Sequence, residues 1–374
     1  MSFESFDLHP DLLRGLRAVG FGTPTPIQTS AIPPAMTGRD VLASAVTGSG
    51  KTAAYLLPIL HRLIAGRRGV TRALVLAPTR ELAAQIDEHR RDLARYARIG
   101  GAAIVGGLAM GPQAQAFRQG AEVLVATPGR LLDHFRHPYA RLDALEVLVL
   151  DEADRMLDLG FLPDIRRILA RVPSRRQTLL FSATIPAPIA ALAREMLRDP
   201  VAIDLERPAA PPAGISHAAY PVEPEAKSGL LLELLRGSRL QTVLAFTRTK
   251  HRADRLAGFL ARHGVPSARI HGNRTQTQRT SALAGFKAGQ FRVLVATDIA
   301  ARGIDIAGLS HVVNFDVPTL PEDYLHRVGR TGRADATGTA LTFVSPGEEA
   351  SLRTIERALR TRIERPVRPG PRRG

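Results

Sequence analysis

The sequence predicts an α/β protein of two tandem domains, each a mostly parallel β-sheet covered by helices on both faces. Short, continuously apolar runs alternate with helical stretches in both halves, and a proline-rich segment separates the halves. Uninterrupted apolar strands spaced by helices are typical of parallel sheets buried on both faces. The apolar runs span residues 41–43, 73–77, 102–105, 123–126, 147–150 and 178–181 in the first half, and 242–246, 292–296, 311–313 and 340–344 in the second.

Length and composition support this two-domain interpretation. A chain of 374 residues exceeds what one core usually holds, and 44% hydrophobic residues suffice for two aliphatic cores. We expect a first domain over residues 1–206, a linker over 207–214, a second domain over 215–364 and a basic, flexible tail over 365–374. The linker holds three prolines in eight residues, which disfavours a helix or a central strand there.

The charge balance favours a polyanionic partner. The chain has 51 Lys and Arg against 35 Asp and Glu, a formal net charge of +16, and most of the excess lies in the second half. It has no cysteine, which excludes disulfides, thiolate metal sites and cysteine nucleophiles and suits a reducing compartment. No apolar run is long enough to span a membrane, so we expect a cytoplasmic protein with no membrane partner.

A glycine-containing segment after the first apolar run predicts a phosphate-binding loop. The order of apolar run, glycine turn and helical stretch directs backbone NH groups and a helix N-terminus at one point, where a polyphosphate binds well. Lys51 is the only lysine before Lys227, and the Thr52 hydroxyl is placed for a magnesium ion. The alternative is a flexible turn with a solvated lysine. The candidate residues are Thr47, Gly48, Ser49, Gly50, Lys51 and Thr52.

A second motif lies just upstream of this loop. Phe21 is followed by Pro24, Pro26 and Gln28, and the prolines stiffen the turn between them. A rigid turn can hold Phe21 against a flat ring and let the Gln28 amide, which both donates and accepts, contact the edge of an adenine. The alternative is an ordinary turn with a buried Phe.

Polar motifs follow the predicted strands of the first half. Because ligands of parallel sheets bind at the carboxyl ends of the strands, these motifs are expected to form one site. Asp151 ends an apolar run and is a candidate for the magnesium shell, while Glu152 can orient an attacking water. The alternative is a helix N-terminus with acids that favour its dipole. The motifs are Pro78–Leu82, Gly106–Gly107, Thr127–Arg130, Asp151–Asp154 and Ser182–Thr184.

The second half has no phosphate loop but has polar motifs of its own. They are His271–Asn273, Gln276 with Arg279, Thr297–Asp298, Ala301–Asp305 and His326–Arg333. In the last motif, arginines at three-residue spacing lie partly on one helical face, and two glycines indicate close approach to a ligand. A solvated basic helix is the alternative.

These motifs, in this order and spacing, resemble the DEAD-box family of ATP-dependent RNA helicases. The resemblance covers about residues 6–345, and within the family the chain is most similar to the bacterial RhlE-like group. It implies two RecA-like domains that bind ATP in the cleft between them and RNA on another face.

The resemblance also implies residue roles for the ATP site. Phe21 and Gln28 would bind adenine, Thr47–Thr52 the phosphates, and Thr52 with Asp151 a Mg²⁺ ion partly through water. Lys51, Asp151 and Glu152 would be catalytic. From the second domain, the family pattern adds His326, Arg330 and Arg333 to catalysis, and Gly303 and Asp305 to the nucleotide.

Further roles follow for RNA and for coupling. Ser182 and Thr184 would couple the ATP site to RNA. The RNA backbone contacts would come from Thr79, Arg80, Gly107, Thr127, Gly129 and Arg130 in the first domain and from Gly272, Asn273 and Thr297 in the second. Hydroxyls and backbone amides suit phosphate oxygens and read no base sequence, so binding should be sequence-independent.

The expected function is an RNA-dependent ATPase that binds RNA across both domains and locally unwinds short duplexes. Two alternatives remain, an ATP-gated RNA clamp or annealing protein, and a DNA translocase on the same core. We expect a monomer; ribosomal or RNA-decay partners are not specified by the sequence. The arginine-rich tail from Arg365 suggests a sequence-blind RNA tether, or else a solvated tail without a role.

Overall fold

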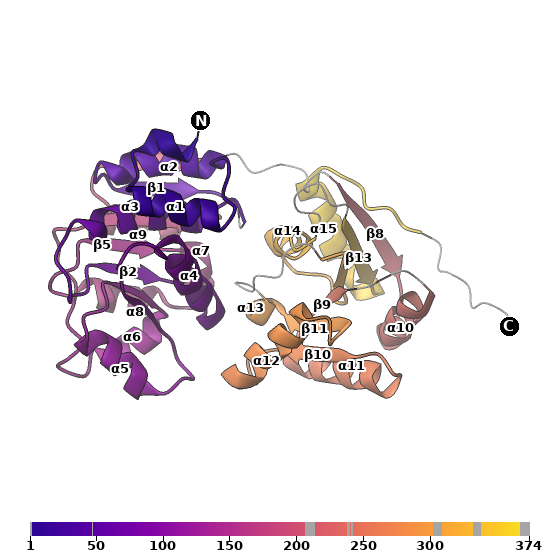
Figure 1. Ribbon diagram of the computed structural model, residues 1–374. Helices are drawn as coiled ribbons and strands as arrows, with labels where there is room; N and C mark the ends of the chain where they lie inside the picture. The colour runs from indigo at the N-terminus through magenta and orange to yellow at the C-terminus, as the bar shows by residue number, and fades with distance from the viewer. Residues whose placement is uncertain are drawn as a thin grey trace. The chain divides into compact units, whose positions relative to one another are not determined.

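The computed structural model describes residues 2–46, 48–205, 214–237, 240, 242–301, 309–331 and 338–366. The chain divides into two compact units, residues 1–207 and 208–374. Each unit is an α/β layer structure in which helices cover a parallel sheet (Figure 1). The predicted fold class is therefore confirmed for both halves.

The first unit contains a seven-stranded sheet in the order β3-β4-β2-β5-β6-β1-β7, and every pairing is parallel. Its strands are β1 (Val41–Ser44), β2 (Ala73–Leu76), β3 (Gly101–Ile104), β4 (Val123–Ala126), β5 (Val147–Leu150), β6 (Gln177–Ser182) and β7 (Val201–Asp204). Its α-helices are α1 (Pro10–Ala18), α2 (Pro26–Met36), α3 (Lys51–Ile64), α4 (Arg80–Leu93), α5 (Met110–Arg118), α6 (Pro128–His134), α7 (Ala153–Asp158), α8 (Leu162–Leu169) and α9 (Ala187–Met196).

The two faces of this sheet carry separate cores. Val75 and Val149 pack with the helices α1 to α4, whereas Leu76 and Leu148 pack with the helices α6 to α9. Successive side chains of a strand point to opposite faces, so burial on both faces requires the uninterrupted apolar runs seen in the sequence.

The second unit contains a six-stranded parallel sheet in the order β10-β11-β9-β12-β13-β8. Its strands are β8 (Ile215–Pro221), β9 (Val243–Thr247), β10 (Ser267–Ile270), β11 (Val293–Thr297), β12 (His311–Asn314) and β13 (Gly338–Val344). Its α-helices are α10 (Lys227–Gly237), α11 (Lys250–Arg262), α12 (Gln276–Lys287), α13 (Asp298–Ala301), α14 (Pro321–Val328) and α15 (Glu349–Leu359).

Three strands were absent from the sequence prediction, and all three lie at sheet edges. These are β7 in the first unit and β8 and β10 in the second. Their residues are partly exposed and mix polar with apolar side chains, whereas the central strands β9 and β11 are buried throughout. An edge strand does not need a continuous apolar run, so it lacks the signal that identified the others.

The segment after α15 covers the outer edge of β8. Ala219 N donates to the Glu364 carbonyl at 2.7 Å, and Ala218 forms an isolated parallel bridge with Glu364. Ile363 is buried in the core that α15 forms with β13. Residues up to 364 are thus part of the folded second unit, and Arg365 still forms an ion pair with Glu349 at 3.0 Å.

A buried ionic cluster fastens α10 to the end of the second sheet. Lys227 is fully buried and donates to the Phe315 carbonyl at 2.9 Å and to Glu348 at 2.5 Å, and it lies 3.6 Å from Asp316. Burial alone raises the pKa of Glu348, but hydrogen bonds from Lys227 and Ser345 lower this pKa below its ordinary value overall. The paired charges and hydrogen bonds compensate the cost of burying these groups.

Candidate functional site

Sheet topology brings the predicted motifs of the first unit to one rim. The strands are parallel, so all their carboxyl ends lie at the same edge of the sheet. The phosphate loop follows β1, Ser182 ends β6 and Asp151 follows β5, and these three strands are neighbours. The predicted RNA motifs follow β2, β4 and β3, on the other side of β5. The strands β5 and β6 therefore lie between β1, which leads into the phosphate loop, and β2, which leads into the first RNA motif.

The phosphate loop is a tight glycine turn that opens α3. Gly48 and Gly50 have φ angles of 83° and 96°, a region that residues with side chains rarely adopt. Lys51 begins the helix, is only 6% exposed, and donates from Nζ to the Ala45 carbonyl at 2.8 Å. Ser49 Oγ donates to the Val46 carbonyl at 2.8 Å. The loop thus closes on itself around a buried ammonium, and Thr47 lies outside the described residues.

The Gln28 motif packs directly on this loop. Thr25 caps α2, and Gln28 Oε1 accepts from Thr25 N at 2.9 Å to complete a capping box. Gln28 Nε2 donates to the Gly50 carbonyl at 3.1 Å, and the side chain is fully buried. Phe21 is 37% exposed and forms an edge contact with Phe3. Gln28 therefore joins the turn to the phosphate loop; adenine binding by Phe21 and Gln28 remains a prediction.

Asp151 is a buried carboxylate that lies near the Lys51 ammonium and accepts hydrogen bonds from a tyrosine hydroxyl and a backbone NH. Its Oδ2 accepts from the Tyr55 hydroxyl at 2.9 Å, and its Oδ1 accepts from Glu152 N at 2.9 Å. Burial raises the pKa of Asp151, and nearby Lys51 and the Tyr55 hydrogen bond lower this pKa only in part. Tyr55 lies one turn after Lys51 on α3, so one helical face presents both groups to the same carboxylate.

The sequence prediction missed Tyr55 because it sits in an apolar run and looks like a core residue. Its ring is fully buried against Phe181, and burial together with Asp151 raises the pKa of Tyr55 well above its ordinary value. Tyr55 thus remains a neutral hydrogen-bond donor. Its position four residues after Lys51 is the signal that would have identified it.

The residues at this rim fit a magnesium ion held mostly through water. Mg²⁺ is bound in proteins by one or two carboxylates together with waters and substrate phosphates. Asp151 supplies a carboxylate close to the phosphate loop, and Thr52 supplies a hydroxyl from the first turn of α3. Glu152, the residue expected to orient water, has a φ of 51° and caps α7. Such a backbone is uncommon for a residue with a side chain and often marks a functional position.

Asp154 links the rim loops after β5 and β6. Its Oδ2 accepts from Thr184 N at 2.8 Å and from Thr184 Oγ1 at 2.9 Å, while its own N donates to Ser182 Oγ at 3.0 Å. The Ser182 carbonyl in turn accepts from Ala45 N, at the start of the phosphate loop, at 3.0 Å. Movement of any one of these loops must therefore disturb the others, which supports the predicted coupling role of Ser182 and Thr184.

The predicted RNA residues of the first unit lie at the ends of β2, β3 and β4. Thr79 caps α4 by accepting from Leu82 N at 3.2 Å. Arg80 lies against Gly107, where a Cβ would be 2.0 Å from its guanidinium. Gly107 also has a φ of 75°, which disfavours a side chain there, and a Cβ would in addition force the Arg80 side chain to move. Thr127 is 8% exposed and occupies the N-cap position of α6 without a capping hydrogen bond from its side chain.

Around Gly129 and Arg130 the structure reveals a residue that the sequence did not identify. A Cβ at Gly129 would meet no atom within 4 Å, so its backbone is open to a ligand. Arg130 contacts Gln113, a buried amide that donates to the Val105 carbonyl and accepts from Val105 N, both at 3.1 Å. His134 also contacts Gln113 at 3.4 Å. Gln113 therefore fastens the loop after β3 to helix α6.

The histidine in this network is neutral at physiological pH. Burial, followed by nearby Arg130, lowers the pKa of His134 to about 4. A neutral imidazole can donate from one ring nitrogen and accept at the other, and its ring contacts Tyr139 Oη at 3.0 Å. The polar signal in the sequence was too weak to place Gln113 or His134 in the site.

The predicted RNA residues of the second unit again follow parallel strands. Gly272 and Asn273 come after β10, and Thr297 ends β11 beside it. A Cβ at Gly272 would meet no atom within 4 Å, and Asn273 Oδ1 accepts from Lys250 Nζ at 3.1 Å. Thr297 is 9% exposed. The structure brings these residues to the ends of two neighbouring parallel strands; RNA binding by them remains a prediction.

Helix α14 and the turn after it carry two predicted catalytic residues of the second unit, His326 and Arg330. His326 is half-buried on the helix and Arg330 follows it with 7% exposure. Arg327 forms a bidentate ion pair with Asp298 at 2.6 and 2.7 Å and donates to Asn314 at 3.1 Å. Arg327 thus anchors the helix to the ends of β11 and β12. The remaining predicted residues Gly303, Asp305 and Arg333 lie outside the described residues.

The fold and the site together define a P-loop nucleotide-binding protein with two tandem RecA-like domains. Residues 25–192 match the DEAD/DEAH box helicase family, and residues 226–335 match the helicase conserved C-terminal domain. The chain belongs to the family of DEAD-box ATP-dependent RNA helicases.

Individual relatives support this assignment along the whole chain. The DEAD-box ATP-dependent RNA helicase CshA of Bacillus subtilis is 42% identical over 99% of this chain and 74% of its own length. The CshA protein of Geobacillus kaustophilus is 41% identical over 97% of this chain and 78% of its own length. The similarity to the RhlE-like group in particular remains a prediction.

Solved structures agree with this. Dbp5 of S. cerevisiae, bound to RNA and ADP BeF3, has a TM-score of 0.88 and 31% identity over 98% of this chain and 95% of that chain. A DEAD box protein from the hyperthermophile Methanococcus jannaschii has a TM-score of 0.57 and 36% identity over 98% of this chain and 99% of that one.

Proposed function

We propose that this chain is an RNA-dependent ATPase that binds the RNA backbone through both domains and locally unwinds short duplexes. The observation that carries the proposal is the chain of hydrogen bonds from the phosphate loop through Ser182 to Asp154 and Thr184. These hydrogen bonds connect the phosphate loop to the loops after β5 and β6. The remaining loops on the same edge of the sheet, after β2, β3 and β4, present threonine hydroxyls and glycine backbone NH groups. The names of the CshA relatives and the RNA-bound Dbp5 structure point to the same activity.

In the first domain, the residues supply the parts that phosphoryl transfer needs. Lys51 holds the phosphates as a buried point charge, and the Asp151 carboxylate with the Thr52 hydroxyl would hold Mg²⁺, which neutralises phosphate charge when bound. Glu152, held by its left-handed backbone at the start of α7, is the group to orient the attacking water. Positioned charges of this kind supply most of the catalysis in phosphoryl transfer.

The second domain would complete the reaction. It would contribute Arg330, which follows the helix that Arg327 anchors, and Arg333, as cations for the transition state. Neither domain should therefore hydrolyse ATP quickly alone. If ATP and RNA both favour the arrangement in which these groups meet, each must favour binding of the other to the same extent.

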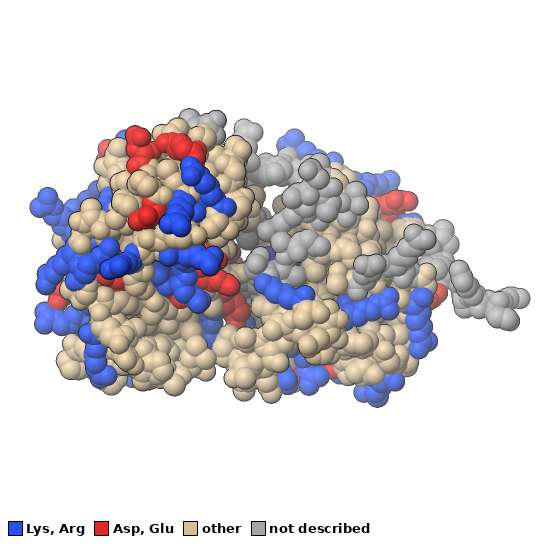
Figure 2. Space-filling model, viewed as in Figure 1, with Lys and Arg blue, Asp and Glu red and all other residues tan. Residues whose placement is uncertain are grey.

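RNA would be attracted by the positive charge of the protein and would bind at the loops that follow the carboxyl ends of the strands. Figure 2 shows Lys and Arg side chains spread over the visible surface of both units, in keeping with the net charge of +16. Phosphate contacts without base contacts would make binding sequence-independent and salt-dependent.

The described part of the chain contains no helix long and apolar enough to cross a membrane. We propose that the protein acts in the cytoplasm as a monomer.

Phosphate-release assays with RNA, with single-stranded DNA and without nucleic acid test the proposal. We expect stimulation by RNA, loss of turnover in Lys51→Ala, and retained ATP binding with stalled hydrolysis in Glu152→Gln. Glu88→Gln, an exposed acid on α4, is the matched control and should turn over normally. Retention of most of the RNA-stimulated rate in Lys51→Ala would contradict the proposed site.

A strand-displacement assay on a short RNA duplex then separates unwinding from clamping. Displacement that needs hydrolysable ATP and fails in Glu152→Gln supports a helicase. ATP-gated RNA binding without displacement would indicate a clamp or annealing protein, and stimulation by DNA rather than RNA would indicate a DNA translocase.

A further inference from the structure

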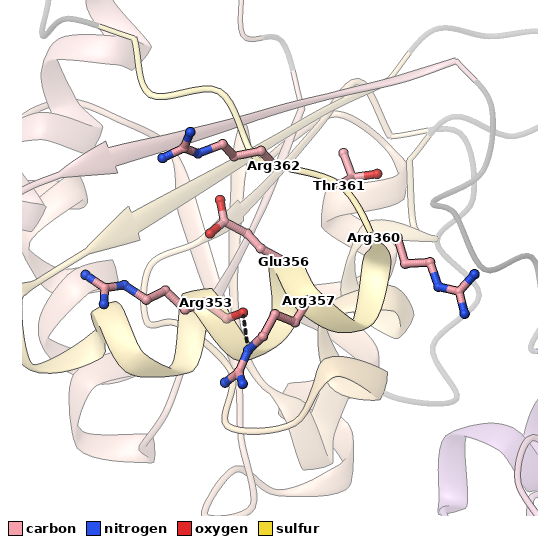
Figure 3. A pocket seen from close by; sticks show the side chains of 6 residues that line it. All are labelled: Arg353, Glu356, Arg357, Arg360, Thr361 and Arg362. Carbon is pink, nitrogen blue, oxygen red and sulfur yellow. Dashed lines mark hydrogen bonds between the residues drawn. The ribbon is translucent and has the colours of Figure 1, made fainter.

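Four arginines gather on the outer surface of α15 and the segment that follows it. They line a shallow depression together with one acidic and one hydroxyl side chain (Figure 3). The lining residues are Arg353, Glu356, Arg357, Arg360, Thr361 and Arg362. This surface is far in sequence from the phosphate loop and from the predicted RNA residues, and none of its members has a role in the site described above.

The amphipathic pattern of α15 fixes the direction of these side chains. Leu352, Ile355 and Leu359 are buried in the core beneath the helix. Arg353 and Arg357 are one turn apart on the opposite, exposed face. The packed helix and the buried Ile363 thus fix the backbone positions from which the exposed arginine side chains extend.

The charge of this surface is not neutralised by the described part of the protein. Within the described ranges, no carboxylate forms an ion pair with Arg353, Arg357, Arg360 or Arg362. The nearest acid in the lining, Glu356, accepts a hydrogen bond from Ile363 N at 3.0 Å and so caps the chain turn after the helix. By contrast, the neighbouring Arg365 is paired with Glu349.

Attraction to the helix dipole explains only part of the cluster. Cations are favoured in the last turn of a helix, which accounts for Arg357 and Arg360. Arg353 lies in the first half of α15, and Arg362 lies beyond its end. Arg360 also has a φ of 50° at a position after a helix where glycine is the common residue. Backbone conformations of this kind are enriched at functional positions, which adds to the case for a role of the Arg360 side chain.

The geometry points to an extended polyanion as the ligand. In Figure 3 the guanidinium groups spread away from one another around Glu356, so a single phosphate cannot contact all of them. No apolar side chain lines the depression, which disfavours a folded protein partner or a membrane, because both usually need apolar anchors. Arginine forms bidentate contacts to phosphate, and a row of separated arginines suits successive phosphates of a nucleic acid strand.

We propose that Arg353, Arg357, Arg360 and Arg362 form an auxiliary contact surface for the sugar-phosphate backbone of single-stranded RNA. The inference rests on the proposed RNA-dependent function. The surface would raise RNA affinity without reading sequence and without taking part in ATP hydrolysis. It differs from the basic tail predicted from the sequence, because it belongs to a folded helix and its adjoining turn.

The test compares two triple variants of the full chain that remove equal charge from the second unit. One is R353Q/R357Q/R360Q. The control is R236Q/R255Q/R262Q on α10 and α11, where the three arginines are also exposed and form no ion pair with a described carboxylate. Glutamine has nearly the helix propensity of arginine at the helical positions, and at residue 360 it replaces one side chain by another without changing the backbone requirement, so both variants should fold.

Binding is measured by fluorescence anisotropy of a labelled oligouridylate of about twenty nucleotides, over a series of salt concentrations. Each phosphate contact on a single strand contributes about 0.7 to the slope of log affinity against log salt, so loss of three contacts should lower the slope by up to about 2. The same relation gives a loss of affinity of about 10- to 100-fold at 0.1 M salt. The control should change affinity by less than about threefold, and turnover at saturating RNA should be unchanged in both.

Arg360→Gly supplies an independent check on folding. Glycine suits the left-handed backbone at this position, so the melting temperature should hold or rise while RNA affinity falls. Equal binding and equal salt slopes for R353Q/R357Q/R360Q and the wild type would overturn this inference alone. Failure of the wild type to bind RNA would overturn the proposed function as well, so the two failures are distinguishable.

Discussion

Gly50 is the position at which the phosphate loop and the Gln28 motif meet, and replacing it by alanine tests both. Its φ of 96° costs an alanine about 1 to 2 kcal/mol, because left-handed backbone brings Cβ against the carbonyl. The new Cβ would also lie 2.5 Å from Gln28 Nε2 and 2.9 Å from Thr25 Oγ1. Gln28 must then move and give up its hydrogen bond to the Gly50 carbonyl.

Leaving a buried donor without its partner costs about 1 to 3 kcal/mol. Added to the backbone term, the expected destabilisation of the first unit by Gly50→Ala is about 2 to 5 kcal/mol. Gly20→Ala is the matched control, because Gly20 has a φ of 78° and a Cβ there would meet no atom within 4 Å. The control should lose only the backbone term, about 1 to 2 kcal/mol.

Far-UV circular dichroism is the suitable stability assay, because the chain contains no tryptophan to report unfolding by fluorescence. The same absence gives a low background for a fluorescent ATP analogue, which measures nucleotide affinity at a temperature where both variants are folded. Gly50→Ala should weaken the analogue at least tenfold, and Gly20→Ala should not. Equal destabilisation of the two variants with unchanged nucleotide affinity would refute the packing of Gln28 on the loop.

Three further predictions follow from the buried polar groups. In Tyr55→Phe the hydrogen bond that lowers the pKa of Asp151 is lost, so the acid limb of the magnesium-dependent ATPase should move to higher pH; an unmoved limb would contradict this. Glu348→Gln should destabilise the second unit by about 3 to 5 kcal/mol at neutral pH, because it breaks a buried pair with Lys227. Because the pKa of Glu348 is lowered in the folded state, its ionised form stabilises the fold above pH 4.5, and this stabilisation is lost as the pH falls through the pKa of the folded state. The melting temperature of Glu348→Gln, measured by circular dichroism, should therefore fall less steeply with decreasing pH than that of the wild type. Gln113→Leu leaves buried backbone groups unpaired at about 1 to 3 kcal/mol, and should weaken RNA binding in anisotropy while ATP-analogue binding stays within about twofold of wild type.

Much of this architecture was predictable because parallel sheets constrain both pattern and site. Central strands must be apolar on both faces, and their carboxyl ends must share one rim, so the sequence alone is enough to group the motifs at Lys51 and Asp151. The edge strands β7, β8 and β10 could not be found in this way, because polar residues are tolerated at the edge of a sheet; the edge strand β3 was predicted because its residues are mostly apolar.

The residues that support the site were harder to predict for a different reason. Tyr55 lies in an apolar stretch of α3, and Gln113 is one of several polar residues of α5, so neither stands out in the sequence. Each acquires its role from a hydrogen-bond partner outside its own helix, Asp151 for Tyr55 and Val105 for Gln113. Arg327 was visible as part of a basic motif, but only the structure shows that it is paired with Asp298 and so belongs to the framework of the second unit.

The hydrogen bond between Ala219 and Glu364 has a practical consequence for handling the protein. Without residues 361–364, the outer side of β8 would present unpaired NH and carbonyl groups to solvent. An open strand edge is a template for pairing with other chains and promotes aggregation. A shortened protein that ends with α15 would therefore risk precipitation, even though the phosphate loop, Asp151 and the polar motifs at the ends of the strands are still present. Versions made for expression and crystallisation should extend beyond Glu364.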